Sequence, residues 1–110
     1  MTKQEAKELS FEVWQYLAKH PNKDKIHLPN LLWRRIMRFS GLCPLCELFK
    51  PSAIPPKECP GCPLKSCSDQ SPYYLWSHAD EYVTPDKDLI AIRKEAAQVI
   101  VKAIEAWRPE

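Results

Sequence analysis

The chain has 110 residues and a net charge of +2, and 45% of its residues are hydrophobic and 27% are charged. This composition predicts one globular domain over residues 1–110 and argues against general disorder. The charged first ten residues, and the lack of any run of roughly 20 apolar residues, predict a soluble, cytoplasmic protein with no signal peptide and no membrane partner.

The first predicted element is a helix over residues 3–19. Thr2 can cap this helix, and Glu5 follows three residues later, which is the spacing of a capping box. Apolar residues recur at helical spacing along one face: Ala6, Leu9, Val13, Tyr16 and Leu17. The helix is expected to end at His20, because a residue that precedes proline is driven out of the helical region.

A basic segment follows, with six lysines and arginines against one aspartate over residues 19–38. Residues 30–39 are predicted to form a short second helix within it. Three of its residues are the candidate nucleic-acid-binding side chains: Arg34, Arg35 and Arg38. Three others are expected to be buried on the opposite side: Leu31, Leu32 and Ile36. Arginines can contact phosphates, but a solvated face explains this charge pattern more simply.

The middle of the chain, residues 40–71, is a proline-rich module that contains all five cysteines. Four of them form two Cys-x-x-Cys pairs separated by twelve residues: Cys43 and Cys46, then Cys59 and Cys62. Each pair can bring two thiolates within reach of one ion, and four thiolates in a tetrahedron suit zinc. In a reducing compartment, clustered cysteines are metal ligands more often than disulfides. The spacing therefore predicts a zinc site made by these four cysteines.

The ligand set and the metal both have alternatives. Cys62 and Cys67 form another possible pair, with four residues between them, and this pair would leave Cys59 free. Pro63 follows the second Cys-x-x-Cys pair, where zinc ribbons usually have glycine, and it has no N–H to donate to a sulfur. This departure leaves two alternatives open: an unusual zinc geometry, or an iron–sulfur cluster as the cofactor. Two disulfides are a third interpretation of the same cysteines.

This module resembles a group of small cysteine-rich phage and prokaryotic proteins of unknown function. The pattern that carries the resemblance is Cys43-Pro-Leu-Cys46, Cys59-Pro-Gly-Cys62-Pro63, Cys67, Ser71-Pro72-Tyr73 and Trp76. The resemblance covers about residues 42–79 and implies a viral or mobile-element context without implying any activity. For a viral protein, the expected location is the cytoplasm of the host.

Two helices are expected after the module. The first is a short helix over residues 72–82. Its cap and first position are predicted from three residues: Asp69, Ser71 and Pro72. The second is a long helix that Thr84 caps and Pro85 begins. Its apolar residues are expected along one face: Leu89, Ile92, Ala96, Val99, Ala103 and Trp107.

Together these elements predict an all-α fold, a small helical domain in which the terminal helices pack around a central metal-binding cysteine knuckle. Four tryptophans are expected to anchor the helices: Trp14, Trp33, Trp76 and Trp107. The sequence contains no phosphate loop, carboxylate pair or Ser/His/Asp arrangement that would indicate an enzyme. The expected function is a non-enzymatic, zinc-stabilised binding or adaptor protein with a protein partner. A small iron–sulfur electron carrier or redox sensor and a nucleic-acid-binding module are the alternatives.

Overall fold

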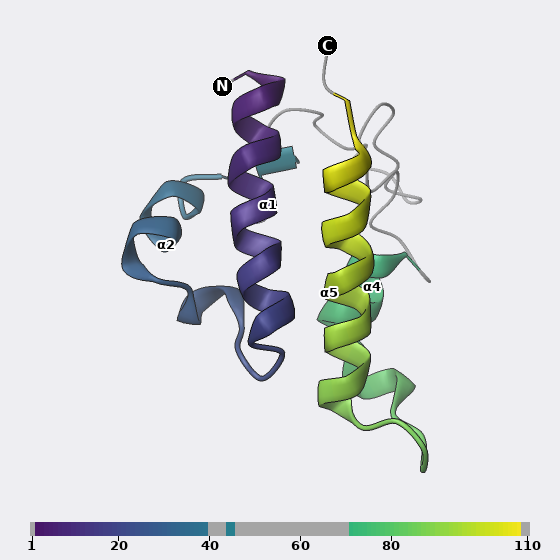
Figure 1. The fold of residues 1–110 in the computed structure, drawn as a ribbon. Coiled ribbons are helices and arrows are strands. Elements are labelled where there is room, and N and C mark those ends of the chain that lie inside the picture. The colour runs from purple at the N-terminus through teal and green to yellow at the C-terminus, as the bar shows by residue number, and fades with distance from the viewer. Residues whose placement is uncertain (1, 40–43, 46–70, 109–110) are drawn as a thin grey trace, which may run out of the picture.

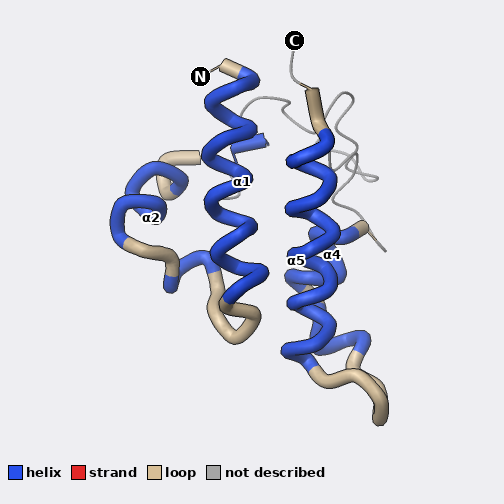
Figure 2. Tube along the Cα trace, in the orientation of Figure 1, coloured by secondary structure: helices blue, strands red, loops and turns tan. Residues whose placement is uncertain are grey.

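The computed structural model describes residues 2–39, 44–45 and 71–108. These residues are mostly helical and include no strand, which confirms the predicted all-α class. The long helices α1 (Lys3–Lys19) and α5 (Leu89–Ala106) lie antiparallel and side by side (Figure 1). Shorter elements lie around this pair (Figure 2): η1 (Lys25–His27), α2 (Asn30–Ile36), α4 (Pro72–Ser77) and η3 (Ala79–Tyr82). None of the described helices is long and apolar enough to cross a membrane.

Both ends of α1 are confirmed as predicted. The Thr2 hydroxyl accepts the N–H of Glu5, and the Glu5 carboxylate accepts the N–H of Thr2, each at 3.1 Å. The hydrogen bond from the Thr2 backbone is the main cause of the lowered pKa of the exposed Glu5 carboxyl. At the other end, His20 is the C-cap and donates its N–H to the carbonyl of Tyr16. The local signals of this helix therefore decide where it begins and ends.

The start of α5 differs from the prediction. Asp88 is its N-cap and accepts the N–H of Ala91 at 2.9 Å. Thr84 closes a turn with Lys87 instead, in which the two backbones exchange hydrogen bonds of 2.9 and 3.3 Å. The Thr84 hydroxyl also accepts the Lys87 N–H, at 3.1 Å. The cap predicted at Thr84 is wrong because the same side-chain chemistry stabilises this turn, and the helix starts after it.

The hydrophobic core lies where α1, α4 and α5 meet. Trp14 of α1 is 1% exposed and makes edge contacts with Trp76, at 5.0 Å between ring centroids, and with Tyr73, at 6.0 Å. The two long helices add buried aliphatic side chains: Leu9, Val13, Leu17, Ile100 and Ile104. Trp33 and Trp107 are partly buried against this core. All four tryptophans therefore anchor the helices, as predicted.

The buried stripe of α5 is only partly the predicted one. Ile92 and Ala96 are buried as expected, but Val99 is 51% exposed. The stripe continues instead through Ile100 and Ile104. Apolar residues occur on several sides of this helix, so two neighbouring stripes fit the same periodicity. The positions of α1 and α4, which both pack against α5, select the one that is buried.

The second helix is shorter than predicted and has a narrower buried side. α2 ends at Ile36, which is fully buried, and Leu32 packs partly against the core. Leu31 is 72% exposed, so its predicted burial is wrong. The reason is geometric, since residues turn by about 100° each along a helix. Leu32 and Ile36 are one turn apart and share a face, whereas Leu31 and Ile36 cannot both face α1.

The predicted helix over residues 72–82 is divided into α4 and η3. Its start is confirmed, because the Ser71 hydroxyl accepts the N–H of Tyr74 at 3.2 Å and Pro72 is the first helical residue. At His78 the backbone leaves the helical region, with φ −119° and ψ 34°. The His78 ring stacks on Tyr74, with 4.0 Å between ring centroids. Asp69, the other predicted capping residue, lies outside the described residues.

The Lys7 side chain of α1 forms hydrogen bonds with the C-terminal end of α5. Lys7 donates from Nζ to the carbonyl of Trp107 at 2.6 Å and to the carbonyl of Glu105 at 3.3 Å. The final carbonyls of a helix have no partner within it, and a cation is favourable at its negative end. These contacts join residues that are up to 100 positions apart. They place the start of α1 beside the end of α5, as Figure 1 shows.

Candidate functional site

The predicted metal ligands all lie outside the described residues: Cys43, Cys46, Cys59, Cys62 and Cys67. The zinc site, the alternative ligand set and the iron–sulfur cluster therefore stay predictions. Among the residues that the structure describes, no group of three or more His, Cys, Asp or Glu side chains could hold a metal ion.

Two residues inside the first Cys-x-x-Cys motif are buried, and one of them belongs to the hydrophobic core. Pro44 is fully buried, and Leu45 is 1% exposed and belongs to the same cluster as Trp14 and Trp76. At the C-terminal end of the cysteine module, Ser71 is 8% exposed and caps α4. The module is therefore attached to the helical core near both of its ends.

The three arginines predicted to bind nucleic acid are exposed on and just after α2: Arg34, Arg35 and Arg38. The Arg35 guanidinium is 3.5 Å from the carboxylate of Glu12, and both side chains are about half exposed, at 49% and 55%. A pair this exposed contributes little to stability. Arg38 lies over the ring of Phe39, at 5.2 Å. These contacts leave the arginines at the surface, and their binding to nucleic acid stays a prediction.

One cation of the basic segment is not at the surface. Lys25 is only 5% exposed, and its Nζ lies 5.3 Å from the ring centroid of Trp14 and 5.1 Å from that of Tyr73. Lysine is rarely buried without partners, and the faces of aromatic rings attract an ammonium group. The solvated-face interpretation therefore fails for this residue, whose charge is held among the aromatic side chains of the core.

A second cation, from α5, covers the same aromatic cluster. The side chain of Arg93 is 14% exposed, and its Cζ lies 4.5 Å from the ring centroid of Trp76. Its Nη2 is 3.6 Å from Oδ1 of Asp24, which is longer than a normal hydrogen bond. Nε of Arg93 and Nε1 of Trp76 are both buried and lack a hydrogen-bond partner. The charge of Arg93 is thus only partly satisfied by its protein neighbours.

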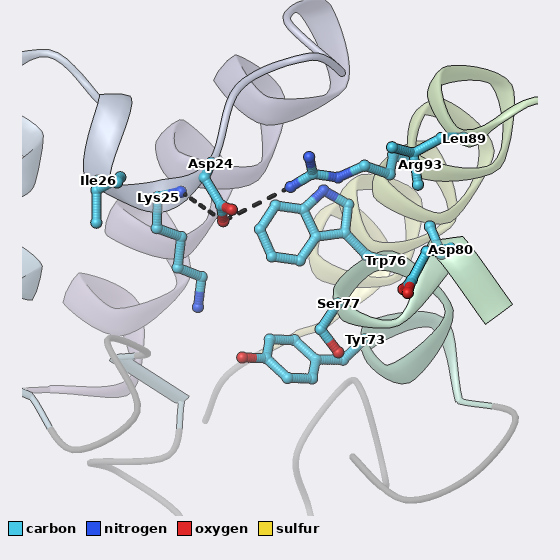
Figure 3. Close-up of a pocket in the computed structure, with 10 residues that line it drawn as sticks. Asp24, Lys25, Ile26, Tyr73, Trp76, Ser77, Asp80, Leu89 and Arg93 are labelled. Carbon is cyan, nitrogen blue, oxygen red and sulfur yellow. Dashed lines mark hydrogen bonds and ion pairs between the residues drawn. The ribbon is translucent and has the colours of Figure 1, made fainter.

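These groups line an open cavity of about 510 Å³ between η1, α4 and the start of α5 (Figure 3). A volume of this size is typical of a small-molecule site. Lys25, Tyr73, Trp76 and Arg93 form much of its lining, and Ser77 adds a hydroxyl group. The carboxylates of Asp24 and Asp80 lie on opposite sides of Trp76 in Figure 3. We name this hollow the cation–aromatic cavity.

No family model, curated protein or solved structure matches this chain. The candidate functions therefore rest on its own residues. The cation–aromatic cavity could not be found from the sequence, because its cations lie far apart in the chain. In the sequence, Lys25 is one of six cations in the basic segment, and Arg93 is a single arginine within the predicted last helix.

Proposed function

We propose that the protein is a non-enzymatic binding or adaptor module whose helical core is stabilised by zinc. The proposed ligands are Cys43, Cys46, Cys59 and Cys62, with Cys67 as the alternative. The observation that carries this proposal is the burial of Leu45, which lies between the first two ligands in the sequence and packs in the core. A metal bound by that pair would fix the proline-rich module to α1 and α4. Structural zinc can contribute on the order of 10 kcal/mol to folding.

A protein partner is supported by large apolar side chains that the described structure leaves uncovered. Ile26, Leu31 and Met37 are each more than half exposed, and all three belong to the segment between α1 and the cysteine module. Where such side chains form one apolar patch, they mark an interaction surface. We place the protein in the cytoplasm, or in the host cytoplasm for a viral protein, where reduced thiols can bind metal.

Metal analysis of anaerobically purified protein tests the cofactor. We expect one zinc per chain and no absorption in the visible range, because zinc has a filled d shell and thiolate ligation gives it no colour there. Iron together with visible absorption would instead support the iron–sulfur carrier. A folded protein that contains no metal would contradict both proposals and favour disulfides.

Nucleic-acid binding is the second candidate, and the exposure of Arg34, Arg35 and Arg38 favours it. If these side chains contact phosphates, affinity for DNA or RNA probes should fall steeply with salt, because each neutralised phosphate releases counterions. Replacing all three with alanine should remove most of the binding and flatten the salt dependence. The fold should survive, since the replaced side chains are exposed and the Arg35–Glu12 pair contributes at most about 1 kcal/mol.

A matched control removes the same charge from other exposed positions by changing Lys3, Lys94 and Lys102 to alanine. If the arginines of the α2 surface bind nucleic acid specifically, this control should keep most of the binding. Its affinity should fall only by the effect of the lower net charge. Equal losses in the two triple variants would show a diffuse electrostatic attraction. No salt-sensitive binding by the unmodified protein would leave the arginines as a solvated face.

A further inference from the structure

We propose that the cation–aromatic cavity binds a small monocarboxylate with an apolar group. In this proposal the carboxylate lies at Arg93, and the apolar group lies against the rings that line the cavity. The proposal is independent of the metal, since every residue that carries it lies in the described part of the chain and outside the cysteine module. It assigns a ligand class to a cavity that the adaptor function does not require.

The carboxylate is indicated by the state of Arg93. A guanidinium group presents parallel N–H donors that match the two oxygens of a carboxylate. Its present partner, Asp24, is 3.6 Å away and 58% exposed, so this ion pair is long and strongly screened by water. Lys25 adds a second, almost fully buried positive charge to the same cavity. A carboxylate that enters can therefore replace Asp24 as the closest anion to Arg93.

Two unpaired donors indicate how the site responds to such a ligand. Nε of Arg93 and Nε1 of Trp76 are buried without an acceptor, an arrangement that is rare in native proteins. The guanidinium lies over the Trp76 ring at 4.5 Å, and because both donors are buried, neither reaches a ligand in this arrangement. When Arg93 turns toward a carboxylate, its Nε gains an acceptor and the indole N–H of Trp76 is uncovered. Binding should therefore change the environment of that N–H.

The apolar part of the ligand is indicated by the rest of the lining. Tyr73 and Trp76 contribute ring surface, and Ile26 and Leu89 line the same cavity while being 66% and 39% exposed. A flat or aliphatic group in the cavity would cover these side chains and remove their apolar surface from water. A purely inorganic anion would leave them exposed.

The charge of the ligand is limited by Asp80. Its carboxylate lines the cavity and lies on the other side of Trp76 from Lys25 (Figure 3). Asp24 lines the cavity as well, so a second anionic group on the ligand would add to the negative charge of two carboxylates and would be repelled. One negative charge therefore fits the cavity better than two, which favours a monocarboxylate over a dicarboxylic acid or phosphate.

Sodium benzoate is a suitable probe, and the readout is the indole N–H signal of Trp76 in ¹⁵N-labelled protein, identified with Trp76→Phe. We expect this signal to shift and saturate with benzoate, and not to shift with benzyl alcohol or inorganic phosphate. Arg93→Met should weaken benzoate binding roughly tenfold or more, because it removes a charge-assisted hydrogen-bonding partner. Lys94→Met, its exposed neighbour on α5, is the matched control and should leave the affinity unchanged.

Asp24→Asn separates this proposal from a purely structural role of the ion pair. Asparagine keeps a side-chain oxygen that can accept the N–H of Lys25, now at 3.1 Å, so η1 should stay capped. Removing the competing carboxylate should tighten benzoate binding about threefold, since screened exposed pairs are worth little. If Arg93→Met does not fold, the benzoate affinity of Asp24→Asn alone tests the proposal. Unchanged or weaker binding to Asp24→Asn, equal binding of benzyl alcohol, or no saturable shift with benzoate would overturn the proposal.

Discussion

Replacing Cys43 or Cys46 with serine is expected to remove the bound zinc and to unfold much of the protein. Serine is a poor zinc ligand, and a structural site of this kind is worth on the order of 10 kcal/mol. A domain of this size has a total stability of only about 5–15 kcal/mol. The loss should also free Pro44 and Leu45, which the core buries between the two ligands. Zinc content and urea unfolding followed by circular dichroism measure the effect.

Two controls separate metal binding from packing. Leu45→Ala should keep the zinc and lose about 2–5 kcal/mol, because it only opens a cavity in the core. Cys67→Ser should keep both zinc and stability, whereas Cys59→Ser should lose them. The reverse result for Cys59 and Cys67 would move the site to the alternative ligand set. A Cys43 variant that lost its zinc but unfolded at the same urea concentration would contradict a structural role for the metal.

The second large effect is expected from Trp14→Ala, at about 3–5 kcal/mol of unfolding free energy. Trp14 is 1% exposed and touches Trp76 and Tyr73, so its removal leaves a large cavity between α1 and α4. It would also remove one of the two rings beside the ammonium group of Lys25. The measurement is equilibrium unfolding in urea, with the m-value checked for two-state behaviour.

Trp14→Phe and Trp107→Ala are the matched variants for this experiment. Phenylalanine keeps a ring at the same position, so the loss should be clearly smaller than with alanine. Trp107 is the same residue type but is only partly buried, and its truncation should cost less than that of Trp14. If Trp14→Ala and Trp107→Ala proved equally destabilising, the core would not be centred on Trp14.

The sequence predicted helices best where local chemistry alone decides the structure. Thr2 and Glu5 form their capping box from residues three positions apart, so the start of α1 needs no other part of the chain. At α5 two capping signals compete, and the turn at Thr84 leaves Asp88 to begin the helix. The exposure of Leu31 and Val99 depends on which neighbour each helix meets, and periodicity does not contain that information.

The candidate sites show the same division between local and distant information. The cysteine spacing is a local signal and predicts a metal site directly, although its ligands lie outside the described residues. The cation–aromatic cavity is formed by η1, which precedes the cysteine module in the chain, and by α4, η3 and α5, which follow it. No sequence rule links Lys25 to Tyr73 or Arg93 to Asp24. Only the folded arrangement identifies these cations as buried or partly buried groups.

The pairing of α1 with α5, to which Lys7 adds hydrogen bonds at the end of α5, has a consequence for folding during synthesis. Lys7 contacts a carbonyl that is 100 residues later in the sequence. Helical domains with mostly local contacts fold fastest, and a contact this distant slows folding because a large loop must close first. As the ribosome produces the chain from its N-terminus, α1 emerges long before its main partner. Its apolar face, including Leu9, Val13 and Leu17, lacks the cover of α5 until that helix has been synthesised, and in that interval its uncovered part is open to chaperones.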